Sequence, residues 1–75
     1  MWFEFNNVIF NIKDLVYIEK VTIRRDGNTI IALEIKTSFG IVRKEYGVLK
    51  DTKAYTEREK DYNIFIAQLK VKSIK

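Results

Sequence analysis

Asp26-Gly27 stands between two long apolar runs, and this arrangement constrains the fold more than any other feature of the chain. Asp-Gly favours a tight two-residue turn, because both positions tolerate a positive φ. Residues 15–25 before it are rich in β-branched side chains, and residues 29–36 after it alternate cleanly. The residues expected on one side of this second run are Thr29, Ile31, Leu33 and Ile35. Alternation with a period of two is typical of a strand with one buried face, so the sequence predicts a long antiparallel hairpin.

Shorter strands are expected on both sides of this hairpin. Residues 2–5 are rich in aromatic side chains, Asn6-Asn7 is a turn signal, and residues 8–12 alternate again. The Thr37-Ser38-Phe39-Gly40 sequence predicts another turn, and the more polar run over residues 41–46 suits an edge strand.

The run over residues 15–25 follows a corner at Lys13-Asp14 and changes its parity part of the way along. Val16 and Ile18 share one parity, whereas Val21 and Ile23 share the other. One extra residue in a strand has this effect, so a β-bulge near Glu19-Lys20 is predicted. The alternative is that the first half of the strand is buried on both faces.

The last third of the chain changes to helical spacing. Thr56 and Glu59 fit a capping box, which predicts a helix over about residues 56–70, with residues 51–55 either a preceding turn or part of the helix. A competing interpretation makes residues 63–71 a last strand, because they have high β propensity. Charge that changes from acidic to basic along the segment favours the helix. The residues expected on its apolar face are Tyr62, Phe65, Ile66 and Leu69.

These elements predict a single α+β domain over residues 1–75. It consists of an antiparallel meander of four or five strands, over about residues 2–46, with one C-terminal helix packed on a face. The chain has neither Cys nor His, so no disulfide or Cys/His metal site can support its core. Hydrophobic residues make up 47% of the 75 residues, which is enough to fold but leaves the core small.

The composition argues against an enzyme. Without His or Cys, the commonest general base and the thiolate nucleophile are both absent. Ser38 and Ser73 are the only serines, and neither lies in a nucleophile motif. No cofactor or metal is therefore expected. Unbroken apolar stretches such as residues 30–33 are only four residues long, so we expect no membrane span and a soluble, cytoplasmic protein.

Trp2, Phe3 and Phe5 are candidate self-association residues. In an extended strand Phe3 and Phe5 share one face and Trp2 takes the other, so one face of this segment must meet water or a partner. A homodimer or higher oligomer would cover it. The alternative is that the C-terminal helix or residues 70–75 fold over the aromatics and keep the protein monomeric.

Five basic residues are candidates for binding a partner or phosphate. These are Lys20, Arg24, Arg25, Arg43 and Lys44, which lie on the predicted hairpin and the strand beside it. If they cluster, they can contact an acidic protein or a nucleic acid. The alternative is a mixed, solvated surface, because 14 cations are interspersed with 10 anions.

Residues 11–20, Asn-Ile-Lys-Asp-Leu-Val-Tyr-Ile-Glu-Lys, resemble a pattern in many short, uncharacterised bacterial and phage proteins. The resemblance implies a strand pair, a corner, three further strands and a helix. Together with the small size, the absence of catalytic residues and the N-terminal aromatics, it leads us to expect a non-catalytic binding module that inhibits or modulates a host or defence macromolecule as a homo-oligomer, with a protein as the expected partner.

The strands also resemble the core of LytTR-type DNA-binding domains, which implies a nucleic-acid-binding or transcription-modulating alternative through the basic hairpin. The chain departs from that family over residues 61–69, which contain no Arg or Lys.

Overall fold

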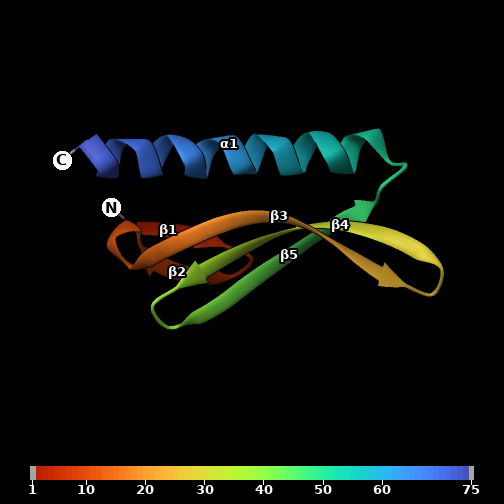
Figure 1. Ribbon diagram of the computed structural model, residues 1–75, viewed down its shortest axis with the longest axis horizontal. Helices are drawn as coiled ribbons and strands as arrows, with labels where there is room; N and C mark the ends of the chain where they lie inside the picture. Colours follow the sequence, from red (N-terminus) through yellow and green to blue (C-terminus); the bar gives the residue numbers. More distant parts are fainter. Residues whose placement is uncertain (1, 75) are drawn as a thin grey trace.

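Five antiparallel strands and one C-terminal helix form the protein in the computed structural model shown in Figure 1. The structure describes the backbone of residues 2–74 and the side chains of residues 2–68. The elements are β1 (Trp2–Phe5), β2 (Val8–Asn11), the 3-10 helix η1 (Ile12–Asp14), β3 (Leu15–Arg25), β4 (Asn28–Thr37), β5 (Gly40–Val48) and α1 (Thr52–Ile74). The α+β class is confirmed, and the molecule measures 43 × 22 × 17 Å.

The strands divide into two sheets instead of forming one continuous meander. β3, β4 and β5 make a three-stranded sheet with β4 in the middle, and β1 and β2 make a separate hairpin. The 3-10 helix between β2 and β3 interrupts the meander. Its Asp14 is bound on both main chain and side chain by Ser38, whose N and Oγ atoms lie 2.9 and 3.1 Å from Asp14 oxygens.

The predicted turn at Asp26-Gly27 is confirmed. Arg25 pairs with Asn28 across a two-residue loop, in which Asp26 has a φ of 51° and Gly27 a φ of 80°. Two consecutive positive φ angles define the tight turn whose twist matches that of the flanking strands. Asn6 and Asn7, with φ angles of 50° and 67°, repeat this arrangement between β1 and β2.

The bulge predicted near Glu19-Lys20 is wrong. β3 pairs with β4 without interruption from Tyr17 to Arg25, and the register shifts between Leu15 and Tyr17 instead. Val16 is the extra residue and is exposed, which leaves Leu15 and Ile18 both in contact with the core. The parity change has a different cause: the strand is regular between Ile18 and Val21, and Ile18 faces the core whereas Val21 and Ile23 lie on the opposite face of the sheet.

The helix begins four residues earlier than predicted, so the expected capping box is wrong. Asp51 occupies the capping position, since its Oδ1 accepts a hydrogen bond from the Lys53 N–H at 3.0 Å. Thr56 lies inside the helix, where its hydroxyl donates to the Thr52 carbonyl at 2.9 Å. Asp caps a helix at least as well as Thr, and Asp51 comes first along the chain. Within the described range, residues 63–71 are helical, so the alternative strand is also wrong.

The core lies between α1 and one face of the two sheets. Phe65 on α1 is its centre, with ring centroids 5.6 Å from Phe3, 5.5 Å from Phe5 and 6.2 Å from Phe10. Leu33 and Ile35 from β4 complete the cluster from the middle of the larger sheet. The predicted positions of Tyr62 and Phe65 against the core are confirmed, and the Leu69 side chain lies outside the described residues.

Polar contacts hold α1 along the larger sheet. The Tyr46 hydroxyl lies 2.6 Å from Asp61, and the Lys20 ammonium lies 3.1 Å from Glu59. Gly47 lets the helix approach closely, because a Cβ atom at this position would lie 3.1 Å from that of Ala54. The guanidinium of Arg58, which is only 8% exposed, reaches the Val21 carbonyl at 3.4 Å. These contacts lie along both edge strands of the sheet, β3 and β5, so the helix is fixed at several points.

We predict that Gly27→Val destabilises the protein by about 1–2 kcal/mol, because a β-branched residue resists a positive φ. Chemical denaturation followed by circular dichroism measures the change in the free energy of unfolding. Asn28→Val is the matched control, since residue 28 begins a strand. Equal stability of Gly27→Val and the wild type would contradict the turn.

Tyr46→Phe is expected to cost roughly 1.5–3 kcal/mol of the free energy of unfolding, because it removes a hydrogen bond to a carboxylate. Burial, together with the Asp61 carboxylate, raises the pKa of Tyr46 above its usual value of 10.0. The unfolded state therefore loses this proton first, and the advantage of the wild type over Tyr46→Phe should be complete below pH 10 and fall above it. Denaturation midpoints of the two proteins across this pH range test the prediction. A constant difference would contradict it.

Candidate functional site

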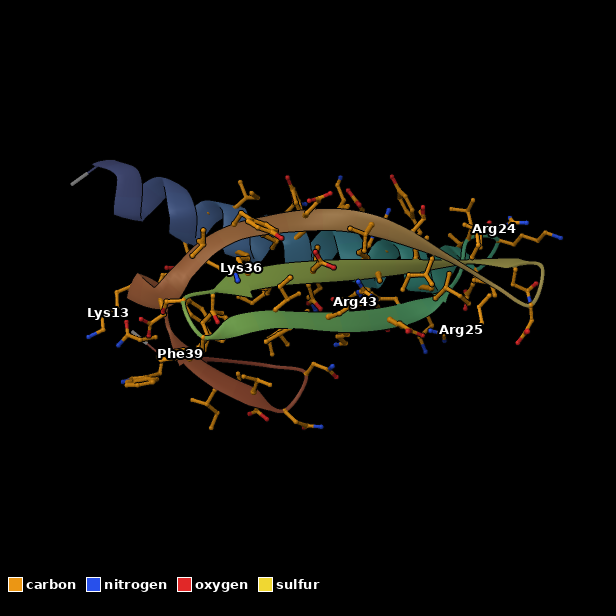
Figure 2. The ribbon with its side chains drawn as sticks, turned by 60° about the horizontal axis from the view of Figure 1, so that its bottom comes forward. Lys13, Arg24, Arg25, Lys36, Phe39 and Arg43 are labelled. Atoms are coloured by element: carbon orange, nitrogen blue, oxygen red, sulfur yellow. The ribbon has the colours of Figure 1, made fainter. Side chains whose placement is uncertain are left out.

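The basic residues predicted to bind a partner do not form one patch. Lys20 and Lys44 lie on the face that carries α1, where each pairs with a helix carboxylate; the Lys44 Nζ atom is 3.6 Å from Asp61. Arg25 and Arg43 lie on the opposite face of the sheet, as Figure 2 shows. Arg24 sits at the hairpin end. The structure therefore brings Arg25 and Arg43 onto one face and separates them from the two lysines.

The face of β3–β5 opposite to α1 is called the open face here, and Figure 2 looks onto it with the helix behind the sheet. The strand register and the alternation of side chains assign its members. The apolar members are Tyr17, Val21, Ile23, Ile30, Ala32, Ile41 and Val48. The polar members are Glu19, Arg25, Asn28, Glu34, Lys36, Arg43 and Glu45. A sheet face in contact with water is usually polar, so this mixed composition is unusual.

Apolar side chains are continuous across the three strands at one part of the open face. Ile23 on β3 is opposite Ile30 on β4, and Ile30 is opposite Val48 on β5. Val21, which is partly exposed, and Ala32, which is fully buried, form the next row. Ile23 and Ile30 are partly exposed, and Val48 is exposed. The row is an apolar band that runs perpendicular to the strands.

One arginine–glutamate pair crosses this band and a second lies beside it. The guanidinium of Arg25 donates to both carboxylate oxygens of Glu45 at 2.8 Å, and that of Arg43 donates to Glu34 at 2.9 and 3.2 Å. The hydrogen bond from Arg25 lowers the pKa of Glu45 below its usual value. Exposed pairs of this kind add little to stability, so they mainly fix the guanidinium planes on the surface.

A second exposed surface, the hairpin patch, consists of Trp2, Val8, Ile9, Phe39 and Ile41. It joins β1 and β2 to the turn between β4 and β5, and Ile41 marks its border with the open face. Phe39 is 82% exposed, Trp2 and Ile9 are each 68% exposed, and Ile41 is 55% exposed. Trp2 and Ile9 are diagonal neighbours on the outer side of the small hairpin. This is a concentration of exposed apolar side chains at one end of the molecule.

A groove of 190 Å³ runs through the hairpin patch between β2 and β5. Its lining residues are Val8, Ile9, Phe10, Thr37, Phe39, Gly40, Ile41 and Val42. The Thr37 hydroxyl donates to the Gly40 carbonyl at 3.0 Å and accepts from the Phe39 N–H at 3.1 Å. The only polar side chain in the lining is therefore already bonded within the protein.

The predicted separation of the N-terminal aromatics is confirmed, because Phe3 and Phe5 face the core whereas Trp2 faces outward. Only Trp2 of these three candidates is therefore available at the surface for self-association, which stays a prediction. Phe39 was not among the candidates. An aromatic residue in a two-residue turn, where Gly, Asn and Asp are preferred, is the signal that could have identified it.

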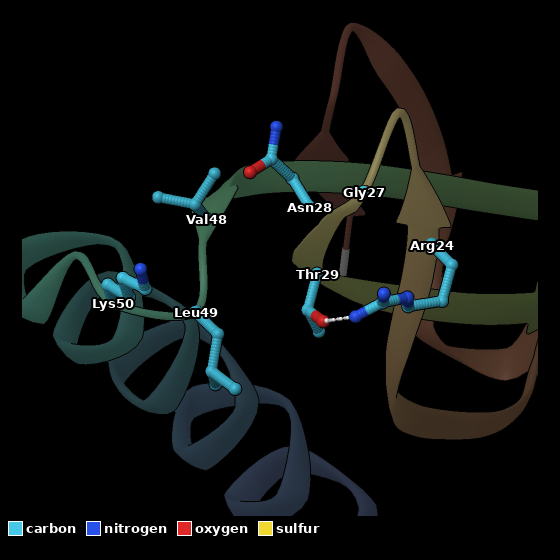
Figure 3. Close-up of a pocket in the computed structure, with 7 residues that line it drawn as sticks. All are labelled: Arg24, Gly27, Asn28, Thr29, Val48, Leu49 and Lys50. Carbon is cyan, nitrogen blue, oxygen red and sulfur yellow. Dashed lines mark hydrogen bonds between the residues drawn. The ribbon is translucent and has the colours of Figure 1, made fainter.

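A notch of 230 Å³ lies at the other end of the sheet, between the β3–β4 turn and the segment that leads into α1 (Figure 3). Its lining residues are Arg24, Gly27, Asn28, Thr29, Val48, Leu49 and Lys50. Arg24 is held over it by a 2.7 Å hydrogen bond to the Thr29 hydroxyl. The lining contains neither a carboxylate nor a base. Both cations are exposed, so the notch can attract a small anion but has no buried donor that would select one.

The part of the chain that the structure describes contains no cluster of three or more Asp or Glu side chains that could hold a metal ion. In the same part, the helix is too polar to cross a membrane. No protein-family model, curated protein or solved structure matches this chain.

We predict that the pKa of Glu45, measured by carboxylate-detected NMR titration, lies below its usual value of 4.5. Arg25→Gln should return it toward that value, because the glutamine cannot supply a positively charged donor. Arg24→Gln is the matched control, since Arg24 bonds to Thr29 instead. A Glu45 pKa that is the same in wild type and Arg25→Gln would contradict the pairing.

Proposed function

We propose that this protein is a non-catalytic module that binds another protein through its open face. The observation that supports the proposal is the apolar band of Ile23, Ile30 and Val48, which the Arg25–Glu45 pair crosses and the Arg43–Glu34 pair flanks. The central parts of protein interfaces are apolar and poor in unpaired charge, and arginine is enriched among the residues that dominate binding. A sheet face that contacts only solvent is usually polar, unlike this one.

The rigidity of the open face favours binding by occlusion. Its side chains stand on three paired strands, and α1 supports the sheet from behind. Little conformational entropy is then lost when a partner covers the face. A module of 75 residues that holds a flat surface in this way can block a functional surface of its partner without any chemistry of its own.

The charges on and around the open face indicate the chemistry of the partner. The chain carries a net charge of +4, but the open face itself is balanced, because Arg25, Lys36 and Arg43 (Figure 2) share it with Glu19, Glu34 and Glu45. A complementary partner surface has an apolar centre and a margin of mixed charge. On the resemblance to short phage proteins, we propose that this partner is a host or defence protein whose surface is inhibited or modulated.

Nucleic acid is the competing partner, and the pairing of the arginines counts against it. Arg25 and Arg43 are each bonded to a glutamate, so a phosphate would have to displace a carboxylate or bind beside one. Lys20 and Lys44 are directed toward the helix carboxylates. The surface is therefore less basic than the count of 14 Lys and Arg suggests.

Affinity capture with the tagged protein, from cells that encode it, tests the proposal. The captured partner is then purified and its Kd measured by calorimetry against wild type and Val48→Glu. This substitution places a charge in the exposed end of the apolar band. We expect a loss of about tenfold or more in affinity, because a carboxylate would be buried without a counter-charge.

Ile64→Glu is the matched control, since Ile64 is similarly exposed but belongs to α1. It should leave the Kd unchanged. Equal affinity of the wild type and Val48→Glu would overturn the assignment of the open face. Tight binding of DNA or RNA that weakens steeply between low salt and about 0.15 M would replace the proposal with the nucleic-acid alternative.

A further inference from the structure

We infer that the hairpin patch associates with the same patch on a second copy of the chain around a two-fold axis, with Phe39 of each copy entering the groove of the other. This inference concerns a different surface from the proposed function. It identifies the occupant of the groove between β2 and β5 from the chemistry of that groove and of the side chains beside it.

The groove selects an apolar occupant. Its walls are Val8, Ile9 and Ile41 with the backbone and side chains around them, and no charged residue lines it. The Thr37 hydroxyl already donates to Gly40 and accepts from the Phe39 N–H, so it has no donor left for a polar ligand. Burying an unpaired polar group is costly, whereas an apolar side chain loses nothing there.

Phe39 is the side chain that matches this groove. It occupies the two-residue turn between Thr37 and Gly40 and projects away from the sheet, as Figure 2 shows. Its exposure of 82% is the highest among the exposed large hydrophobic residues of the described chain. The groove volume of 190 Å³ can accommodate a ring of this size. An aromatic residue that protrudes beside an apolar groove has the character of an interface anchor.

The occupant is a second copy because the protruding ring and the groove lie on one surface. Two copies related by a two-fold axis satisfy both rings and both grooves with one self-complementary interface, which closes without leaving a free patch. In such a pair Phe39 would also contact its counterpart, since it forms one wall of the groove. Aromatic pairs in this arrangement add stability beyond their buried area.

The available area fits a dimer of modest affinity. The five side chains of the hairpin patch expose roughly 600 Å², against about 800 Å² per partner in a standard interface. Polar residues at the margin, among them Glu4, Asn7 and Ser38, would supply the remainder. Apart from Ile41 at its border, the open face stays accessible in the dimer, so each pair would present two copies of it and gain avidity for a repeated partner.

Sedimentation equilibrium over the micromolar range tests the inference, with wild type, Phe39→Asp and Leu49→Asp. Leu49 is a matched control, because it is an exposed leucine at the other end of the sheet. We expect a concentration-dependent dimer for wild type and Leu49→Asp. Phe39→Asp should weaken association by about tenfold or more, because it replaces the buried ring with a charge.

Tryptophan fluorescence supplies a second measurement. Trp2 is the only tryptophan of the chain and is exposed in the single copy, so its emission should shift to the blue as the concentration rises. The shift should be absent in Phe39→Asp, whose fold is checked by circular dichroism, and Phe39→Ala provides a neutral variant for comparison.

A species of 8.9 kDa for wild type throughout the range would overturn the inference, and so would a dimer that neither Phe39→Asp nor Phe39→Ala weakens. Binding of the captured partner to monomeric Phe39→Asp separates the two proposals. If this binding is retained, the open face remains the partner surface whatever the oligomeric state.

Discussion

The contact of Phe65 with three phenylalanines is the interaction on which the rest of the structure depends. Phe3 and Phe10 belong to the small hairpin and Phe65 belongs to the helix, so this cluster joins the two sheets through α1. A two-stranded hairpin alone is barely stable in water. The helix supplies the apolar surface that the hairpin lacks. In return, the hairpin extends the core beyond the edge of the larger sheet, where Asn6 bonds to the Arg43 carbonyl at 2.7 Å.

Local sequence signals predicted the elements of this fold. The boundaries of these elements were predicted less accurately, because several residues give equivalent signals. Asp26-Gly27 has few alternatives to a tight turn, so the hairpin follows from two residues. Thr56 is a good helix cap in isolation, but Asp51 caps one turn earlier, and no property of Thr56 reveals this. The predicted bulge failed for another reason, because apolar residues on opposite faces of a regular strand change parity without any extra residue: Ile18 faces the core, whereas Val21 and Ile23 lie on the open face. The two sheets are separated by the 3-10 helix, whose Asp14 bonds to Ser38, a residue distant in sequence.

The candidate surfaces were less predictable, because they depend on which charges meet. The alternation of side chains along the strand predicted that Trp2 lies on the other face from Phe3 and Phe5, and the burial of these residues agrees with that prediction. The basic residues could not be assigned in the same way. Lys20 and Lys44 share a face with the helix carboxylates only because α1 crosses that side of the sheet, and neither Glu59 nor Asp61 reveals its partner from spacing. The apolar band likewise becomes visible only when the register of all three strands is known.

The position of Phe65 late in the chain also determines when the small hairpin can fold during synthesis. The small hairpin is made first, yet its phenylalanines have no cover until residue 65 has been added. The β3–β4 hairpin joins the two longest strands through a two-residue loop and can pair while later residues are still being assembled. Folding during translation would therefore proceed from the middle of the chain outward, with Phe3, Phe5 and Phe10 exposed until α1 arrives. During that interval the nascent chain offers aromatic side chains to chaperones, and a ribosome that pauses before residue 65 prolongs the exposure.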